Sequence, residues 1–227
     1  LAEDLKPNRL EAAKDVAAEF INGRPNDNIG ITLFAGETFT QCPLTVDHAV
    51  LLDMIHNIKC GLIEDGTAVG MGIANAVTRL KDSKAKSKVI ILLTDGTNNK
   101  GDISPLTAAE IAKSFGIRVY TIGVGTNGMA PYPYPVGNTV QYVNMPVEID
   151  EKTLTQIAGT TDGNYFRATS NSKLKEVYEE IDKLEKTKLN VKEYSKRDEE
   201  YQWFALVAFL CVLLEVLLRN SILKKIP

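Results

Sequence analysis

Asp95 and Thr67 are the side chains whose types and positions in this sequence best fit metal chemistry. Asp95 follows closely on the unbroken apolar run 89–93, which is typical of a strand covered on both faces of a sheet. Thr67 comes directly before a helix expected over residues 68–81. Ligands in parallel α/β sheets bind beyond the carboxyl ends of the strands, so both side chains are expected on one rim. A hard divalent cation such as Mg2+ prefers such oxygen ligands.

Each candidate ligand also has a simpler explanation. A threonine immediately before a helix is a good N-cap, whatever its surroundings. An aspartate before a glycine, as Asp95 is before Gly96, can form a turn. His48 and His56 share one helical pattern without a cysteine or carboxylate at ligand spacing, which favours solvent or packing roles over zinc. The residues alone leave the explanations of Thr67 and Asp95 open.

The elements that must position these residues alternate along the chain. Helical patterns cover residues 8–21, 46–58, 68–81, 105–116, 150–159 and 171–188, and strand patterns cover 29–35, 38–42, 88–94, 117–124 and 164–168. The second strand follows the first so closely that the two should form a hairpin. Strands alternating with helices of this length predict an α/β fold: a doubly wound, Rossmann-like, mostly parallel sheet with helices on both faces.

Composition and charge exclude one class of partner. The chain has 26 Lys and Arg against 29 Asp and Glu, a formal net charge of −3, so no nucleic-acid binder is predicted. With 227 residues, 44% of them hydrophobic, the chain can bury one core and has an appendage left over. It begins at Leu1 without the features of a signal peptide, so we expect a fragment or a processed form.

The appendage lies at the C-terminus. The stretch 203–218, "WFALVAFLCVLLEVLL", carries one charge, Glu215, and extending it to Leu223 gives 21 residues. A transmembrane helix needs about 20 apolar residues, so we predict a span over 203–223. We predict a domain over 1–188, a juxtamembrane linker over 189–202 and a basic tail over 224–227. An amphipathic core helix is the alternative for the apolar stretch.

An insertion over residues 127–148 lies on the same rim as the candidate ligands. It holds the tyrosines Tyr132, Tyr134 and Tyr142 together with four prolines and two methionines. Prolines at alternate positions exclude the helix that dinucleotide binding by the preceding glycines would require. The composition predicts a stiff, partly apolar loop suited to contact with a partner, with a self-packed surface loop as the alternative.

Two cysteines lie at the ends of neighbouring elements. Cys42 ends the predicted hairpin, and Cys60 ends the helix that returns from it. A disulfide between them is possible in an oxidising compartment, and two unpaired thiols are the alternative. Cys211 falls in the predicted membrane segment.

Two motifs resemble the von Willebrand factor type A family: "GTAVG" at 66–70 and "VIILLTDGTNN" at 89–99. The resemblance covers residues 1–185 and implies a metal-ion-dependent adhesion site for Mg2+ or another divalent cation. In that site Thr67 matches the threonine and Asp95 the aspartate. The family's D-x-S-x-S motif is missing here and would fall just upstream of "LAEDLKPNRLEAAK". The resemblance therefore implies that the central strand and three ligands are absent from this chain.

A narrower resemblance is to BatA-type aerotolerance proteins of bacteria, carried by "FAGETFTQCPLTVDHAVLL", "KCGLIEDGTAVG", "NMPVEIDE" and "LLRNSILKKIP". It implies a domain anchored in the bacterial inner membrane on the periplasmic side, with protein partners and a link to MoxR-type ATPases. We therefore predict a binding module without enzymatic activity, held in lipid by its C-terminal helix. A structural scaffold with a degenerate metal site is the alternative. A hydrolase or phosphate-handling enzyme using Asp95 is less favoured, because no phosphate loop or nucleophile elbow is present.

Overall fold

A computed structural model describes residues 2–136, 139–195, 206–210, 212, 214–216 and 218, and gives only the backbone between 187 and 195. The helices are α1 (Arg9–Asn22), α2 (His48–His56), α3 (Val69–Leu80), α4 (Pro105–Ser114), α5 (Glu151–Thr160) and α6 (Asn171–Ser195). The strands are β1 (Ile29–Phe34), β2 (Thr38–Thr45), β3 (Lys88–Thr94), β4 (Ile117–Val124), β5 (Met129–Val136), β6 (Thr139–Pro146) and β7 (Tyr165–Ala168).

The strands form three separate sheets. β3, β4 and β7 are parallel in the order β3-β4-β7, with Lys88 opposite Ile117 and Thr94 opposite Gly123. β1 and β2 form an antiparallel ribbon, which confirms the predicted hairpin. β5 and β6 form a second antiparallel ribbon in place of the predicted loop. The α/β class is confirmed, and the parallel part of the sheet consists of three strands in the described residues.

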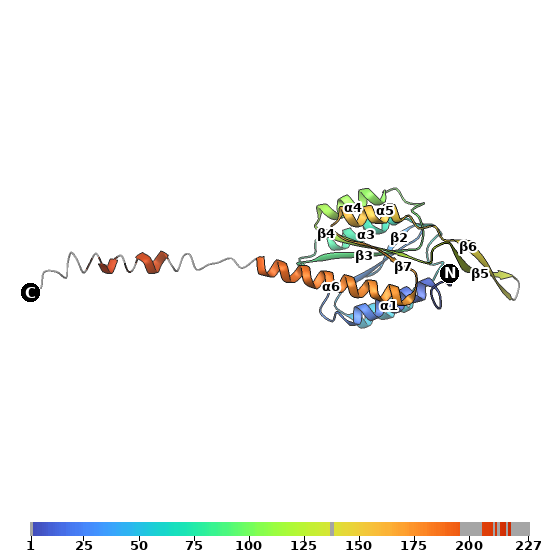
Figure 1. The fold of residues 1–227 in the computed structure, drawn as a ribbon, viewed down its shortest axis with the longest axis horizontal. Coiled ribbons are helices and arrows are strands. Elements are labelled where there is room, and N and C mark those ends of the chain that lie inside the picture. The colour runs from blue at the N-terminus through green and yellow to red at the C-terminus, as the bar shows by residue number, and fades with distance from the viewer. Residues whose placement is uncertain are drawn as a thin grey trace, which may run out of the picture. The chain divides into compact units, whose positions relative to one another are not determined.

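Helices cover both faces of the parallel sheet, as predicted. Figure 1 shows α3, α4 and α5 on one side of the strands and α1 and α6 on the other. Ile73 of α3 and Ile157 of α5 pack with Ile90 and Val119 in one buried cluster. A second cluster on the opposite face joins α1 and α6 to β4 and contains Ala12, Leu174, Ile181, Tyr120 and Ile122. These two clusters fix the sheet whose carboxyl end carries Asp95.

Among the described residues, β1 and β3 each have one edge without a strand partner. Within the described residues no strand pairs with the second edge of β3, and β1 pairs only with β2. Ile31 and Leu33 of β1 are half-buried, and so are Ile91 and Leu93 of β3. Apolar strand residues that remain half-buried mark a place where the sheet can accept further covering.

The chain divides into two units, Leu1–Lys186 and Thr187–Pro227. α6 continues to Ser195, so residues 189–195 of the predicted linker are helical. None of the helices in the described residues has the length and apolar content of a membrane span. Most of the predicted span 203–223 and all of the tail 224–227 lie outside those residues, so both stay predictions.

Candidate functional site

The structure brings Thr67 and Asp95 to the same rim. Asp95 follows Thr94, the last residue of β3, and its side chain is 55% exposed. The Thr67 hydroxyl lies against Gly96, the residue directly after Asp95, since a Cβ added to Gly96 would be 3.2 Å from Thr67 Oγ1. Thr67 and the residue directly after Asp95 therefore lie side by side at the carboxyl end of a parallel strand, although their loops are far apart in sequence.

Thr67 does not cap α3. The N-cap is Ala68, and no side chain makes the capping bond in the usual way. Instead the side-chain oxygen of Asn98 accepts the Val69 N–H at 2.9 Å, and that of Asn99 accepts the Thr67 N–H at 2.8 Å. The two asparagines tie the Thr67 loop to the loop after β3. The Thr67 hydroxyl is thus not used in capping.

Asp95 is not the turn-forming side chain either. The hydroxyl oxygen of Thr94 accepts the Gly96 N–H at 3.3 Å, so the threonine shapes this turn. The Asp95 carboxylate instead accepts a bond from a distant residue: Arg9 Nη1 lies 3.2 Å from Asp95 Oδ2. Both simpler explanations for the candidate ligands are therefore wrong.

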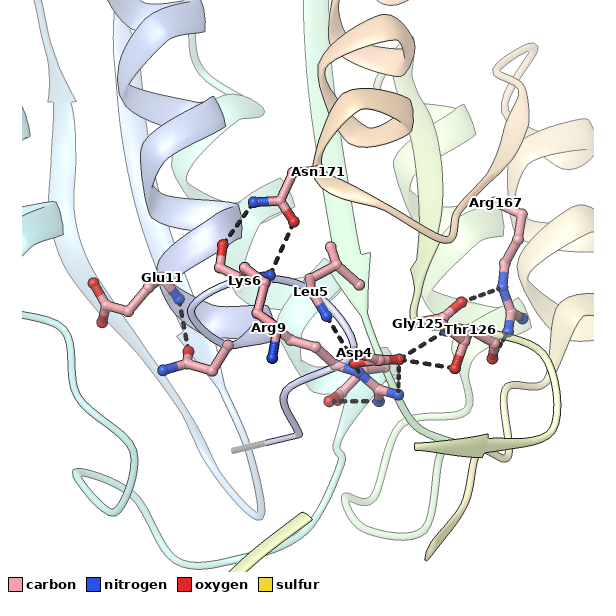
Figure 2. Close-up of polar contacts among 11 residues, drawn as sticks. Asp4, Leu5, Lys6, Arg9, Glu11, Gly125, Thr126, Arg167 and Asn171 are labelled. Atoms are coloured by element: carbon pink, nitrogen blue, oxygen red, sulfur yellow. Dashed lines mark hydrogen bonds and ion pairs between the residues drawn. The ribbon is translucent and has the colours of Figure 1, made fainter. Parts of the chain in front are cut away.

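Arg9 is the centre of an ion-pair cluster that the sequence did not reveal. Its Nε and Nη2 donate to Asp4 Oδ1 and Oδ2 at 2.7 and 2.8 Å, and its third nitrogen reaches Asp95. The side chains of Arg9 and Asp4 are 9% and 2% exposed. Figure 2 shows Asp4 between Arg9 and Thr126, whose N–H and hydroxyl donate to Asp4 Oδ2 at 2.8 and 3.2 Å.

The surroundings of Asp4 and Arg9 favour the charged form of both side chains. Burial by itself raises the pKa of Asp4, but bonds from Arg9 and Thr126 hold that pKa well below its usual range. Burial likewise lowers the pKa of Arg9, and Asp4 and then Asp95 more than reverse this. Both groups are therefore charged, and Arg9 places one positive charge directly beside the exposed Asp95.

Glycine is required where Arg9 meets the loop after β4. Gly125 has φ +138°, and an added Cβ would lie 2.6 Å from Arg9 Nη2. From the other side, Arg167 donates to the carbonyls of Gly125 and Thr126 at 3.1 and 2.9 Å (Figure 2). Two arginines thus fix this loop, which in turn fixes Asp4.

One signal in the sequence could have indicated the cluster. Arg9 is the first residue of α1, where the positive end of the helix dipole favours acids over cations. An arginine there, closely preceded by an aspartate and on the expected rim, calls for a compensating carboxylate. The periodicity of the helix gave no reason to assign Arg9 or Asp4 to a site.

Thr67 and Asp95 fit part of a metal shell. Their oxygens suit Mg2+, which takes about six ligands. Across the described residues no group of three or more His, Cys, Asp or Glu side chains could hold a metal ion. Arg9 also engages one oxygen of Asp95. A cation held here would need further ligands and would share Asp95 with the guanidinium.

The three tyrosines predicted to meet a partner all lie on the β5–β6 ribbon. Tyr134 and Tyr142 are each 59% exposed, and Tyr132 is half-buried. The Tyr142 hydroxyl donates to Glu3 Oε1 at 3.3 Å, and the charge of Glu3 raises the pKa of Tyr142. The ribbon therefore adjoins the N-terminal segment that carries Asp4.

Cys42 and Cys60 are both free in this structure, which corresponds to the alternative of two unpaired thiols. Cys42 is buried with Leu51 and Ile55 beneath α2, whereas Cys60 is exposed. Burial raises the pKa of the Cys42 thiol, and Asp47 raises it further. Cys211 lies outside the described residues.

Comparison with known proteins defines the class of this fold and rim. The family model for the von Willebrand factor type A domain matches residues 3–180, so the chain belongs to that family. It is similar to the protein BatB from Bacteroides thetaiotaomicron, with 33% identity and a TM-score of 0.70 over 82% of this chain and 93% of that one. An aerotolerance-related membrane protein from Bacteroides fragilis has 30% identity and a TM-score of 0.70 over 81% and 90%.

The chain spans part of the length of its curated relatives. An uncharacterized protein of Borreliella burgdorferi is 27% identical over 96% of this chain, which corresponds to 64% of that protein. A mussel byssus matrix protein shares the fold, with 24% identity and a TM-score of 0.61 over 81% of this chain and 43% of that one. That protein's metal-ion-dependent adhesion site is occupied by zinc.

Proposed function

We propose that the chain is a membrane-anchored binding module that captures a protein partner through a divalent cation, Mg2+ or a similar ion. The observation that carries this proposal is that the Thr67 hydroxyl lies against Gly96, the residue directly after the exposed Asp95, at the end of β3. A cation bound there keeps open coordination positions, which an Asp or Glu of the partner can fill. Binding, rather than catalysis, is the chemistry that such a rim supports.

We further propose that the remaining ligands come from a strand between β1 and β3. The half-buried Ile31, Leu33, Ile91 and Leu93 support this, because an added strand would cover them. Its carboxyl end would lie beside Asp95 if it ran parallel to β3. A D-x-S-x-S segment at that end would supply the carboxylate and hydroxyls that Thr67 and Asp95 lack.

The likeness to an aerotolerance-related membrane protein supports a cellular setting for this module. We propose that residues 203–223 anchor it in lipid at the bacterial inner membrane, with the domain on the periplasmic side. Its partners are then other proteins of an envelope or stress-tolerance complex that includes a MoxR-type ATPase.

A scaffold with a degenerate site is a second candidate, favoured by one observation. Arg9 Nη1 already lies 3.2 Å from Asp95 Oδ2 and supplies a positive charge where a cation would otherwise bind. If the guanidinium replaces the metal permanently, the rim holds the domain together and captures nothing through a cation.

Calorimetry separates these two candidates. The chain is extended with an upstream D-x-S-x-S strand and titrated with Mg2+ and Mn2+. We expect binding, and we expect Asp95→Ala and Thr67→Ala each to weaken it by at least about tenfold, as even outer-shell changes do at metal sites. Asp102→Ala, an exposed carboxylate in the same loop, is the matched control and should bind normally. No binding by the extended chain would favour the scaffold.

A further inference from the structure

The β5–β6 ribbon is an exposed and uncharged element. No Asp, Glu, Lys or Arg occurs from Asn127 to Val147, and every residue of β6 is exposed. Figure 1 shows the ribbon extending away from the parallel sheet. Its exposed large apolar residues are Met129, Tyr134, Val136, Val140, Tyr142, Val143 and Met145. Concentrated exposed apolar surface of this kind marks an interaction site.

The register of the ribbon decides which backbone groups point outward. The Val147 N–H donates to the Gly128 carbonyl at 2.7 Å, and hydrogen-bonded and non-bonded pairs alternate from there. The outward positions are therefore Pro131, Pro133 and Pro135 on β5, opposite Asn144, Tyr142 and Val140 on β6. The Glu3 N–H donates to the Pro131 carbonyl at 2.9 Å, which confirms that this group points away from β6.

The two edges of the ribbon consequently differ. Along β5, prolines stand at Pro131, Pro133 and Pro135, so this edge has no N–H to offer there. Along β6, Val140, Tyr142 and Asn144 each turn an N–H and a carbonyl outward. No hydrogen bond from another described residue reaches those groups.

The open edge lacks the usual protection against pairing. Natural edge strands are blocked by charges, prolines or bulges. β6 has no charged residue, its one proline is its last residue, Pro146, and its register with β5 runs without a bulge. The prolines of β5 show the protective device on one edge, and β6 lacks it.

We propose that a second copy of this chain pairs with the β6 edge. In an antiparallel two-fold arrangement, Tyr142 faces Tyr142 of the second copy, and Val140 faces its Asn144. Each copy supplies donors and acceptors at the same three positions, so the edge is complementary to itself. Because neither edge is charged, no like charges oppose each other across the pair.

Paired charge substitutions in the full 227-residue chain test this register. Val140→Lys with Asn144→Lys sets like charges opposite each other and should weaken self-association by about tenfold. Val140→Lys with Asn144→Glu sets each introduced lysine opposite the introduced glutamate of the other copy and should restore it. Sedimentation equilibrium measures association, and matching urea midpoints show that both variants fold equally.

The difference between the two double variants is the decisive result. Association through other parts of the chain is the same in both and cancels. Equal association of the two variants would overturn the proposal, whether both associate as the unmodified chain does or both fail to. A monomeric unmodified chain at high concentration would overturn it as well.

A proline variant tests the edge by a second route. Asn144→Pro removes an outward N–H without removing a bond to β5, as the prolines of β5 already do. It should weaken self-association, whereas Pro133→Ala, which adds an N–H to the other edge, should not weaken it. Unchanged association of Asn144→Pro would show that β6 is not the interface.

Discussion

Two arginine–carboxylate clusters lie at opposite ends of β4, and they differ in how their acids are covered. At the start of β4, Arg118 donates from Nε and Nη2 to Glu185 of α6, both at 2.9 Å. Ser87 and Tyr120 donate to the same carboxylate at 2.8 and 2.6 Å. Glu185 is 5% exposed and has all its near partners within the protein.

At the other end of β4, Arg9 and Asp4 form a similarly buried pair, but the third member of this cluster is exposed to solvent. Asp95 belongs to it through a single bond from Arg9 and remains 55% exposed. A buried ion pair therefore does not by itself mark a functional site in this domain. What distinguishes the rim is an acceptor that is positioned by the cluster and still faces solvent.

The largest expected effect is on the closed cluster. Glu185→Ala leaves Arg118 without its partner and should lower the free energy of unfolding by about 3–5 kcal/mol. Urea unfolding measures the change. Glu185→Gln keeps the side chain's shape and one acceptor oxygen, so it should lower the free energy of unfolding by less. A midpoint unchanged by Glu185→Ala would contradict the structural role of this cluster.

Acid should weaken the same cluster. Burial raises the pKa of Glu185, but bonds from Tyr120, Arg118 and Ser87 lower it below its ordinary value. A depressed folded-state pKa gives stability that is present above the unfolded value, about 4.3, and is lost as pH falls through the folded value. The urea midpoint should therefore fall as the pH is lowered below about 4, and it should fall less steeply in Glu185→Gln. If the urea midpoints of the unmodified chain and Glu185→Gln fell equally with pH, other acids would account for the loss of stability.

Gly125→Ala should have an intermediate effect on the open cluster. The new Cβ meets Arg9 Nη2 at 2.6 Å, and the backbone has φ +138°, so we expect a loss of about 1–3 kcal/mol. Gly128→Ala is the matched control, because its φ is +95° but nothing lies within 4 Å of the added atom. Equal losses in thermal unfolding would assign the whole cost to backbone strain.

Asp95→Ala should have the smallest effect on stability. Asp95 is exposed, and Arg9 retains its ion pair with Asp4 when Asp95 is removed. The expected loss in the free energy of unfolding is therefore within about 1 kcal/mol. Asp4→Ala leaves the buried guanidinium with only its single bond to the exposed Asp95 and should cost about 3 kcal/mol. Urea unfolding of both variants sharpens the contrast between an acid that holds the fold and one that serves a ligand. A large loss from Asp95→Ala would assign it a structural role.

Local pattern predicted much of the fold. The apolar run of β3 and the helical periods gave the elements and the α/β class, because sheet burial and helix amphipathicity repeat over short distances. The adjacency of Thr67 and Asp95 was also predictable, since parallel strands place their carboxyl ends on one rim. None of this needed knowledge of long-range contacts.

What the sequence did not reveal depends on contacts between distant residues. Arg9 bonds to Asp95, which lies 86 positions away in the sequence, and no local pattern encodes that pair. The segment 127–148, which holds this ribbon, was predicted as a loop from its composition, with Pro131, Pro133 and Pro135 at alternate positions. They are compatible with β5 only because the register turns each proline nitrogen away from β6.

The same three prolines limit how many copies can join. A ribbon with two open edges can add copies indefinitely and grow into a fibril. If two ribbons join through β6, the outer edges of the product are both β5, where Pro131, Pro133 and Pro135 offer no donors. Growth then stops at the pair, so one blocked edge makes an aggregation-prone segment self-limiting.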